Sequence, residues 1–514
     1  MTQAIRGERG SPGLAAPRLA LAVLCAGQML IVLEQNIVNV ALPDLQRGLG
    51  FSSANLVWVV NAYLVPFGGL LMLAGRLGDL IGRRTVFLTG VALFSAASLL
   101  CGFATSEAAL IGFRFVQGVG GAVASACILG MVATMAPEPR AQVQAIAAYS
   151  FASAGGAAVG PPIGGALTDL ASWNWIFFIN APVGAAVIVG ALRTLPRDTG
   201  PGLGRGRGRG RGVDVPGAAL VTAGLMLFVF TIVNAGQVGW RAGETLLLGP
   251  LSIALLAGFL AREATAAAPL LPLAMLRSRA VAAANLVQFL LIAGMFGLLF
   301  YGTLYVQRVL GYTSLQAGLA FVPIAVVIAA FSLGLSARLI MRFGPWVLLL
   351  GGLALITFAF GGLALARVDG TYLVDVLPAT VLMGVGVGMA IPAVMALGMS
   401  AVEPGAAGVA SGLFNTSQQI GGAIGLTVLS AVVSARTDSL ADSGSSETSA
   451  LLGGYHLGFL LAAGFTCGAL LVTLTLLRTP RGPAANTRIP GADPTTPARV
   501  SSDQGAGGVF LGSS

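Results

Sequence analysis

The sequence predicts an all-α integral membrane protein with fourteen transmembrane helices. Its composition is too apolar for a soluble protein, because 56% of the 514 residues are hydrophobic and 9% are charged, against about 25% charged residues in soluble domains. The apolar residues also form repeated runs of about 20, the length at which a helix crosses the hydrocarbon core. The polar segments between the runs are short, which excludes an inserted soluble domain.

The apolar runs define the spans in chain order. The first run is too long for a cleaved signal peptide and carries Glu34, so we expect it to be the first spanning helix. The predicted spans are residues 18–43, 54–75, 85–105, 108–134, 142–168, 174–194, 214–235, 244–263, 280–306, 314–337, 346–366, 372–399, 407–434 and 454–478. Between the last two, residues 437–453 are expected to form a polar outer loop.

The arginines predict the orientation, because cytoplasmic segments of membrane proteins are enriched in positive charge. The chain has no lysine, so its net charge of +9 rests on 28 arginines. With the N-terminus inside, 22 of them fall in cytoplasmic segments, 5 fall in outer segments, and Arg114 lies within a span. We therefore expect an even number of spans and both termini in the cytoplasm.

Two segments outside the spans have a biased composition. Residues 204–212 read GRGRGRGRG and predict a flexible, basic linker between the sixth and seventh spans. RNA and the anionic lipid headgroups of the inner leaflet are its two candidate partners, and the lack of a soluble basic face favours lipid. The residues after Arg478 are rich in Pro, Gly, Ser, Thr and Ala, which predicts a disordered tail.

Ionisable groups inside a membrane are the strongest functional signal in such a chain. Glu34 lies about nine residues below the outer surface on the first span, and Arg114 lies about six residues below it on the fourth, so their depths differ by only about 5 Å. They are therefore expected to face each other. The pair is either a structural ion pair or a proton site, where burial favours the neutral carboxyl and the arginine favours the charged one.

Other features of the sequence argue against a metal site, a disulfide, an enzyme and a sensor. The four cysteines have no close spacing, and His456 is the only histidine, so we expect no disulfide and no metal site. The chain has no GxxxxGK[ST] phosphate loop and no cluster of catalytic groups, so we expect no cofactor and no enzyme activity. A sensor would carry a soluble output domain, and the tails are too short for one.

The loop after the second span carries a longer motif. Residues 75–84 read GRLGDLIGRR, which resembles the signature of the major facilitator superfamily at this position. Five further segments resemble its branch of fourteen-span drug:proton antiporters. They are LEQNIVNVALP at 33–43, LIGFRFVQGVGGA at 110–122, GAAVGPPIGG at 156–165, WNWIFFINAPVG at 173–184 and GLFNTSQQIGGAIG at 412–425.

The resemblance implies two six-helix bundles around a central cavity, with two additional helices between them. The expected segments are a cytoplasmic tail at 1–17, the first bundle at 18–194, the linker at 195–213, the additional helices at 214–263, the second bundle at 280–478 and the tail at 479–514. The protein is expected to be a monomer in the inner (cytoplasmic) membrane, in contact with lipid and without a nucleic-acid partner.

The resemblance also assigns roles to residues. It implies proton coupling by Glu34 and Arg114, a conformational latch at Gly75, Asp79, Gly82, Arg83 and Arg84, and an antiporter motif at Gly156, Gly160, Pro161, Pro162, Gly164 and Gly165. We expect Asp79 to approach the thirteenth span near residues 405–412 and to latch the outward-open state. The antiporter motif is expected to bend the fifth span, to pack closely against the second bundle and to prevent a proton leak.

Three positions depart from the family pattern. The first-helix motif usually has an aspartate, and Glu34 moves the carboxyl outward by about one methylene. Asn174 and Gln418 stand where arginine is common, so two positive charges are missing.

The implied function is export of lipophilic drugs or antibiotics in exchange for protons. Candidate substrate-binding residues, each of which is equally open to a packing or interhelical bonding role, are Gln28, Asn61, Tyr63, Gln288, Phe289, Tyr301, Phe321 and Asn415. Spans nine and ten contain no carboxylate, which favours neutral, monocationic or weakly anionic compounds over dications. The alternative is a dedicated exporter of an endogenous metabolite, such as a self-made antibiotic, a siderophore, an amino acid or a sugar. An uptake symporter fits the fifth-span motif less well.

Overall fold

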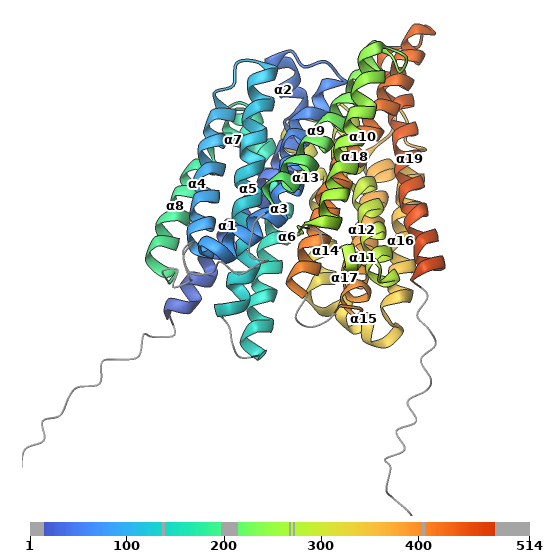
Figure 1. Ribbon diagram of the computed structural model, residues 1–514. Helices are drawn as coiled ribbons and strands as arrows, with labels where there is room; N and C mark the ends of the chain where they lie inside the picture. Colours follow the sequence, from blue (N-terminus) through green and yellow to red (C-terminus); the bar gives the residue numbers. More distant parts are fainter. Residues whose placement is uncertain are drawn as a thin grey trace, which may run out of the picture. The chain divides into compact units, whose positions relative to one another are not determined.

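The computed structural model describes residues 15–135, 139–196, 214–266, 269–270, 273–402 and 407–477 (Figure 1). Within these ranges every regular element is a helix, and twelve helices are long and apolar enough to cross a membrane. The chain is therefore a multi-pass membrane protein. The linker repeat at 204–212 and the predicted tail at 479–514 lie outside the described residues.

The first half of the chain forms a set of closely packed helices. Its elements are α1 (Ala15–Val40), α2 (Leu42–Leu49), η1 (Asn55–Val57), α3 (Trp58–Ile81), α4 (Arg83–Gly102), α5 (Glu107–Met135), α6 (Pro139–Leu170), α7 (Trp175–Phe178) and α8 (Asn180–Thr194). Helix α1 packs against α6 and α8, while α5 packs against α3 and α4. This arrangement places the side chain of Glu34, on α1, next to α5 and α8.

Two helices follow the linker, α9 (Val215–Val238) and α10 (Gly243–Thr265), and they pack against each other. Helix α9 also contacts α3 from the first half and α18 from the second.

The second half consists of α11 (Leu273–Leu276), α12 (Arg279–Gly297), η2 (Leu298–Gly302), η3 (Tyr305–Val309), α13 (Ser314–Ala320), α14 (Val322–Ala330), η4 (Phe331–Leu335), α15 (Ser336–Phe343), α16 (Pro345–Leu363), η5 (Tyr372–Val376), α17 (Leu377–Met399), α18 (Ala407–Asp442) and α19 (Glu447–Leu476).

Twelve of the predicted spans coincide with the twelve long apolar helices, and the other two, 142–168 and 314–337, fall on α6 and on α13 to α15. The second of these is not one regular helix. Pro323 is the second residue of α14, so it has no backbone N–H to continue the ladder from α13, and the break falls at Phe321. A π-helical turn, Phe331–Leu335, then separates α14 from α15.

The polar outer loop predicted at 437–453 is wrong in extent. Helix α18 continues to Asp442 and α19 begins at Glu447, which leaves only residues 443–446 between them. The prediction failed because hydropathy marks the part of a helix that lies in lipid. Polar residues continue the backbone hydrogen bonds of the same helix beyond that part.

Candidate functional site

Glu34 on α1 and Arg114 on α5 meet in the interior of the first half. Their side chains are fully buried, and Nη1 of Arg114 lies 2.6 Å from Oε1 of Glu34. The sequence places these residues at a similar depth on two helices, and the structure brings them into direct contact. A buried charge without a partner is strongly destabilising, so each of these two groups requires the other.

Arg114 is held by contacts beyond the ion pair. Its Nε donates a hydrogen bond to the backbone oxygen of Val59 at 2.9 Å, and Nη1 also donates to Oε1 of Gln117 at 2.8 Å. The guanidinium carbon lies 4.6 Å from the centroid of the Tyr63 ring. Tyr63, a predicted substrate-binding residue, therefore stacks on the arginine, which is a cation–π contact.

The second carboxylate oxygen of Glu34 is bound from a different helix. Nδ2 of Asn180, the first residue of α8, donates to Oε2 of Glu34. The same nitrogen lies 3.0 Å from Oγ of Ser98 on α4, and that hydroxyl donates to the backbone oxygen of Phe177 at 2.8 Å. The pattern of residue types does not single out Asn180 or Ser98. The available signal for Asn180 is an amide within an otherwise apolar stretch of the motif at residues 173–184.

The predicted latch lies at the junction of α3 and α4. Gly82, with φ +107°, is the one residue between the two helices, and this conformation favours glycine. Asp79 is exposed and pairs with Arg83 one helical turn later, at 2.9 Å. Arg84 donates to the backbone oxygen of Leu192 at 2.8 Å, and Gly75 lies within α3. Asp79 as a latch to the thirteenth span stays a prediction, because residues 403–406 lie outside the described part of the chain.

The antiporter segment presents two faces to two different neighbours. Gly156, Gly160 and Gly164, spaced four residues apart, lie on the face of α6 that contacts α1. A Cβ added at Gly156 would lie 2.7 Å from the backbone oxygen of Met29. Part of the motif therefore packs within the first half, and the expectation that the whole segment faces the second half is wrong.

The other face of the same segment contacts the second half of the chain. A Cβ at Gly165 would lie 2.3 Å from the backbone oxygen of Ser314 on α13. A Cβ at Gly318 would lie equally close to the backbone oxygen of Pro161, and Pro162 lies beside it. Helix α6 remains one continuous element through both prolines. Glycine at positions 165 and 318 thus allows α6 and α13 to pack with their backbones in contact.

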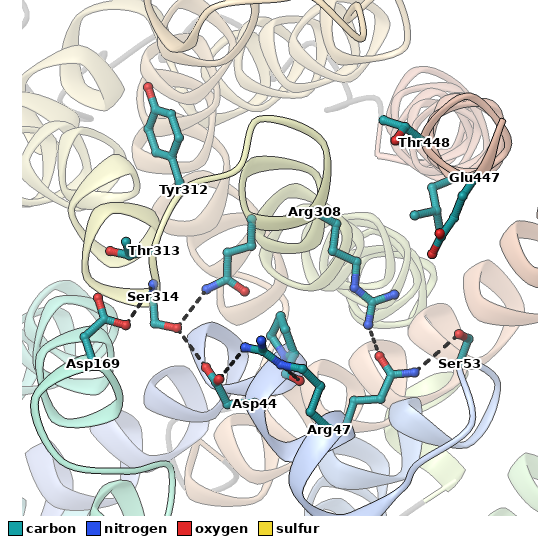
Figure 2. A pocket seen from close by; sticks show the side chains of 14 residues that line it. Asp44, Arg47, Ser53, Asp169, Arg308, Tyr312, Thr313, Ser314, Glu447 and Thr448 are labelled. Atoms are coloured by element: carbon teal, nitrogen blue, oxygen red, sulfur yellow. Dashed lines mark hydrogen bonds and ion pairs between the residues drawn. The ribbon is translucent and has the colours of Figure 1, made fainter.

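Side chains at the neighbouring end of the molecule also join the two halves. Asp169, at the end of α6, accepts hydrogen bonds from the backbone N–H groups of Ser314 and Leu315 at 3.1 and 2.9 Å. Asp44 accepts one from Oγ of Ser314 at 3.0 Å, as Figure 2 shows. Gln307 donates to the backbone oxygen of Val40 at 2.7 Å. This end of the interface between the halves is therefore held closed.

The same contacts border a cavity of about 770 Å³ (Figure 2). Its charged lining residues are Asp44, Arg47, Asp169, Arg308 and Glu447. None of the eight predicted substrate-binding residues lines it. This polar cavity is therefore distinct from the binding site predicted from the sequence.

The predicted substrate-binding residues fall into three groups. Asn61 on α3 donates to Oγ1 of Thr427 on α18 at 2.7 Å, and Gln288 donates to Oε1 of Gln418 at 3.4 Å, so both join helices. Packing residues form the second group: Tyr301 lies 5.7 Å from Tyr455 between ring centroids, and Gln28, Tyr63 and Phe321 are buried. Asn415 is exposed and Phe289 is half-buried. Their roles in binding stay predictions.

The two positions that lack the family's arginine have neutral partners. Nδ2 of Asn174 donates to the backbone oxygen of Gly102 at 2.7 Å. Gln418 accepts from Gln288, as described above. An amide therefore occupies each position and makes an interhelical hydrogen bond without a buried charge.

Comparisons with known proteins agree with this architecture. The family model described as Major Facilitator Superfamily matches residues 24–426. The puromycin resistance protein pur8 of Streptomyces alboniger is 37% identical over 461 residues, which cover 89% of this chain and 90% of that protein. The cephamycin export protein CmcT of Amycolatopsis lactamdurans is 37% identical over 421 residues, or 81% and 85%.

A solved structure shares the fold. The crystal structure of a bacterial homolog to the human lysosomal transporter Spinster, in an inward-facing and occupied conformation, aligns with a TM-score of 0.63 and 16% sequence identity. The alignment covers 91% of this chain and 98% of that one. At this identity the likeness shows the fold alone.

Proposed function

The chain belongs to the Major Facilitator Superfamily, and we propose that it exports lipophilic drugs or antibiotics across the cytoplasmic membrane in exchange for protons. The names of its relatives support this substrate class, since one is a puromycin resistance protein and another is a cephamycin export protein. Their similarity extends over more than four-fifths of the chain. A transporter, rather than an enzyme, is the class that this family and fold indicate.

The observation that carries the proton coupling is the buried contact between Glu34 and Arg114. Glu34 is an acidic side chain that lies fully buried within a spanning helix, α1, and it has both a charged and a neutral partner. Protonation would release Arg114 from the ion pair, and deprotonation would restore it. The carboxyl would therefore take up a proton on one side of the membrane and release it on the other as the halves alternate.

The proposal includes a topology of fourteen spans with both termini in the cytoplasm. Twelve helices, α6 and the α13–α15 segment supply that number, and the distribution of arginines supports the orientation. In this orientation the end that carries Asp44 and Asp169 is the outer end. The state described is then closed to the outside, with the two halves joined by the hydrogen bonds of Asp169 and Gln307. We expect a monomer that needs no cofactor beyond the proton gradient.

Drug accumulation in a pump-deficient bacterial host tests this function. Cells that express the wild-type chain are expected to accumulate less puromycin and less ethidium than cells with the empty vector. Cells that express Glu34→Gln are expected to resemble the empty vector, because the amide cannot exchange a proton. Equal export by the variant and the wild type would refute coupling through Glu34, while a failure of both to export any antibiotic would favour a dedicated exporter of an endogenous metabolite.

A further inference from the structure

Asn180 joins the Glu34 carboxyl on α1 to the Ser98 hydroxyl on α4. It is fully buried at the start of α8, and its Nδ2 donates to Oε2 of Glu34 and lies 3.0 Å from Oγ of Ser98. Its own amide oxygen is also buried, and it has no hydrogen-bond partner within the described part of the chain. A buried acceptor left without a partner is costly, so a state of the site in which Oδ1 is used would relieve that cost.

An amide can reach a state in which Oδ1 has a hydrogen-bond partner. Nitrogen and oxygen occupy nearly equivalent places at the end of an asparagine, so a half-turn of the amide exchanges a donor for an acceptor. When Glu34 is ionised, the carboxylate only accepts, and Nδ2 is the matching partner. When Glu34 carries a proton, its O–H donates, and Oδ1 becomes the matching partner. Ser98 can serve both orientations, because its hydroxyl accepts from Nδ2 and, when it turns away from the backbone oxygen of Phe177, can donate to Oδ1.

We propose that Asn180 is a positioning residue that holds the Glu34 carboxyl in both of its protonation states by turning its amide, with Ser98 as its support. The inference rests on the proposed function, in which Glu34 binds and releases a proton. Arg114 cannot serve this purpose, because a guanidinium has no acceptor and stabilises the ionised state alone. Asn180 would keep the carboxyl in place after Arg114 is released.

Three other charged or titratable groups face the carboxyl among the described residues. Arg114 on α5 forms the ion pair, Tyr63 on α3 stacks on Arg114, and Cys101 on α4 lies 3.7 Å from Oε1 of Gln117. These are also the groups whose charges act on Glu34 or are acted on by it. Asn180 differs from Arg114 because it is neutral, and from Tyr63 and Cys101 because it has no titratable proton and binds the carboxyl directly.

The test compares two variants with the same outline, Asn180→Thr and Asn180→Val, in the full-length protein in liposomes. Threonine both donates and accepts, while valine does neither. Infrared difference spectra recorded against pH follow the protonated carboxyl of Glu34, and Glu34→Gln identifies its band. The hydrogen bond to the ionised carboxylate is stronger than the one to the neutral acid, so the loss of both in Asn180→Val is expected to raise the midpoint of this titration by about one pH unit. Loss of the acceptor is also expected to move the carbonyl band of protonated Glu34 to higher wavenumber, while Asn180→Thr keeps both values close to wild type. A raised midpoint with an unchanged band would show a fixed donor and would overturn the turning of the amide.

Asn174→Val is the matched control, because Asn174 also makes one interhelical bond and lies outside this network. Equal midpoints for Asn180→Val and Asn180→Thr would overturn the inference, even where Glu34→Gln abolishes transport. A Glu34 band that does not titrate would overturn it as well, and would also count against proton coupling. If valine prevents folding, Asn180→Ser and Asn180→Ala provide the same contrast at a smaller volume.

Discussion

Arg114 is the side chain on which the buried polar network depends most. It donates to Glu34, to Gln117 and to the backbone of Val59, and its face carries the ring of Tyr63. A glutamine at this position would leave the Glu34 carboxylate buried without a positive partner. We expect Arg114→Gln to destabilise the fold by about 3 to 5 kcal/mol, measured by unfolding in detergent, and to abolish export.

The double variant is the internal control for this prediction. Glu34→Gln together with Arg114→Gln removes both charges, so it is expected to be more stable than Arg114→Gln alone while remaining inactive. If the changes in unfolding free energy of the two single variants add up to that of the double variant, the two side chains do not interact in the membrane.

Asp79 leads to a different kind of expectation, because it is exposed and forms an ion pair with Arg83 on the surface. An exposed ion pair contributes little to stability. Asp79→Asn should therefore fold like the wild type, as judged by its thermal midpoint in detergent. If Asp79 latches the outward-open state, the variant should nevertheless export more slowly, and an unchanged rate would remove Asp79 from the mechanism.

The contact of Glu34 with Arg114 could be predicted from the sequence, whereas the contact with Asn180 could not. Depth in a membrane follows from counting residues along each helix, and two charges at one depth have a strong reason to meet. The Asn180 contact depends on the rotation of α8 and on its position beside α1. Those are fixed by the packing of many apolar side chains that resemble one another in sequence.

Helix α6 is the element that connects the local packing to movement of the halves. Gly156, Gly160 and Gly164 face α1 on one side, and Gly165 and the two prolines face α13 on the other. A side chain at position 318 would meet the backbone of Pro161, which cannot turn aside as a side chain can. The backbone contact between α6 and α13 therefore depends on glycine at this position.

We expect Gly318→Val to separate α6 from α13 and to keep this end of the molecule open. The measurement is the reaction of Ser314→Cys, a buried position beside the cavity of Figure 2, with a membrane-impermeant maleimide in a background where the native cysteines are replaced. Labelling is expected to increase and export to decrease. Gly155→Val is the matched control, because no atom lies within 4 Å of a Cβ at that position of α6. Equal labelling of the two variants would contradict this role.

Helix positions could be predicted from sequence better than helix ends and breaks. Apolar runs located the long helices because a membrane imposes one length on each of them. The polar extensions of α18 and α19 and the interruption at Phe321 follow different rules. Backbone hydrogen bonds continue into water beyond the apolar run, and the missing N–H of Pro323 interrupts a helix whose side chains are uniformly apolar.

The two halves together form an arrangement suited to alternation. They are joined at one end by Asp44, Asp169 and Gln307, and through Asn61 to Thr427 in the interior. Water can replace the donor or the acceptor in each of these hydrogen bonds when that end opens. The buried pair of Glu34 and Arg114 lies within one half, so its protonation changes that half rather than the interface directly.

The central claim is that movement of substrate is coupled to a proton carried by Glu34. The most direct measurement is proton flux in proteoliposomes loaded with a pH-sensitive dye, with no imposed pH gradient, after a gradient of puromycin is applied. The wild-type chain is expected to move protons against the direction of the drug, and Glu34→Gln is expected to move none. Proton movement by Glu34→Gln equal to that of the wild type would contradict the account.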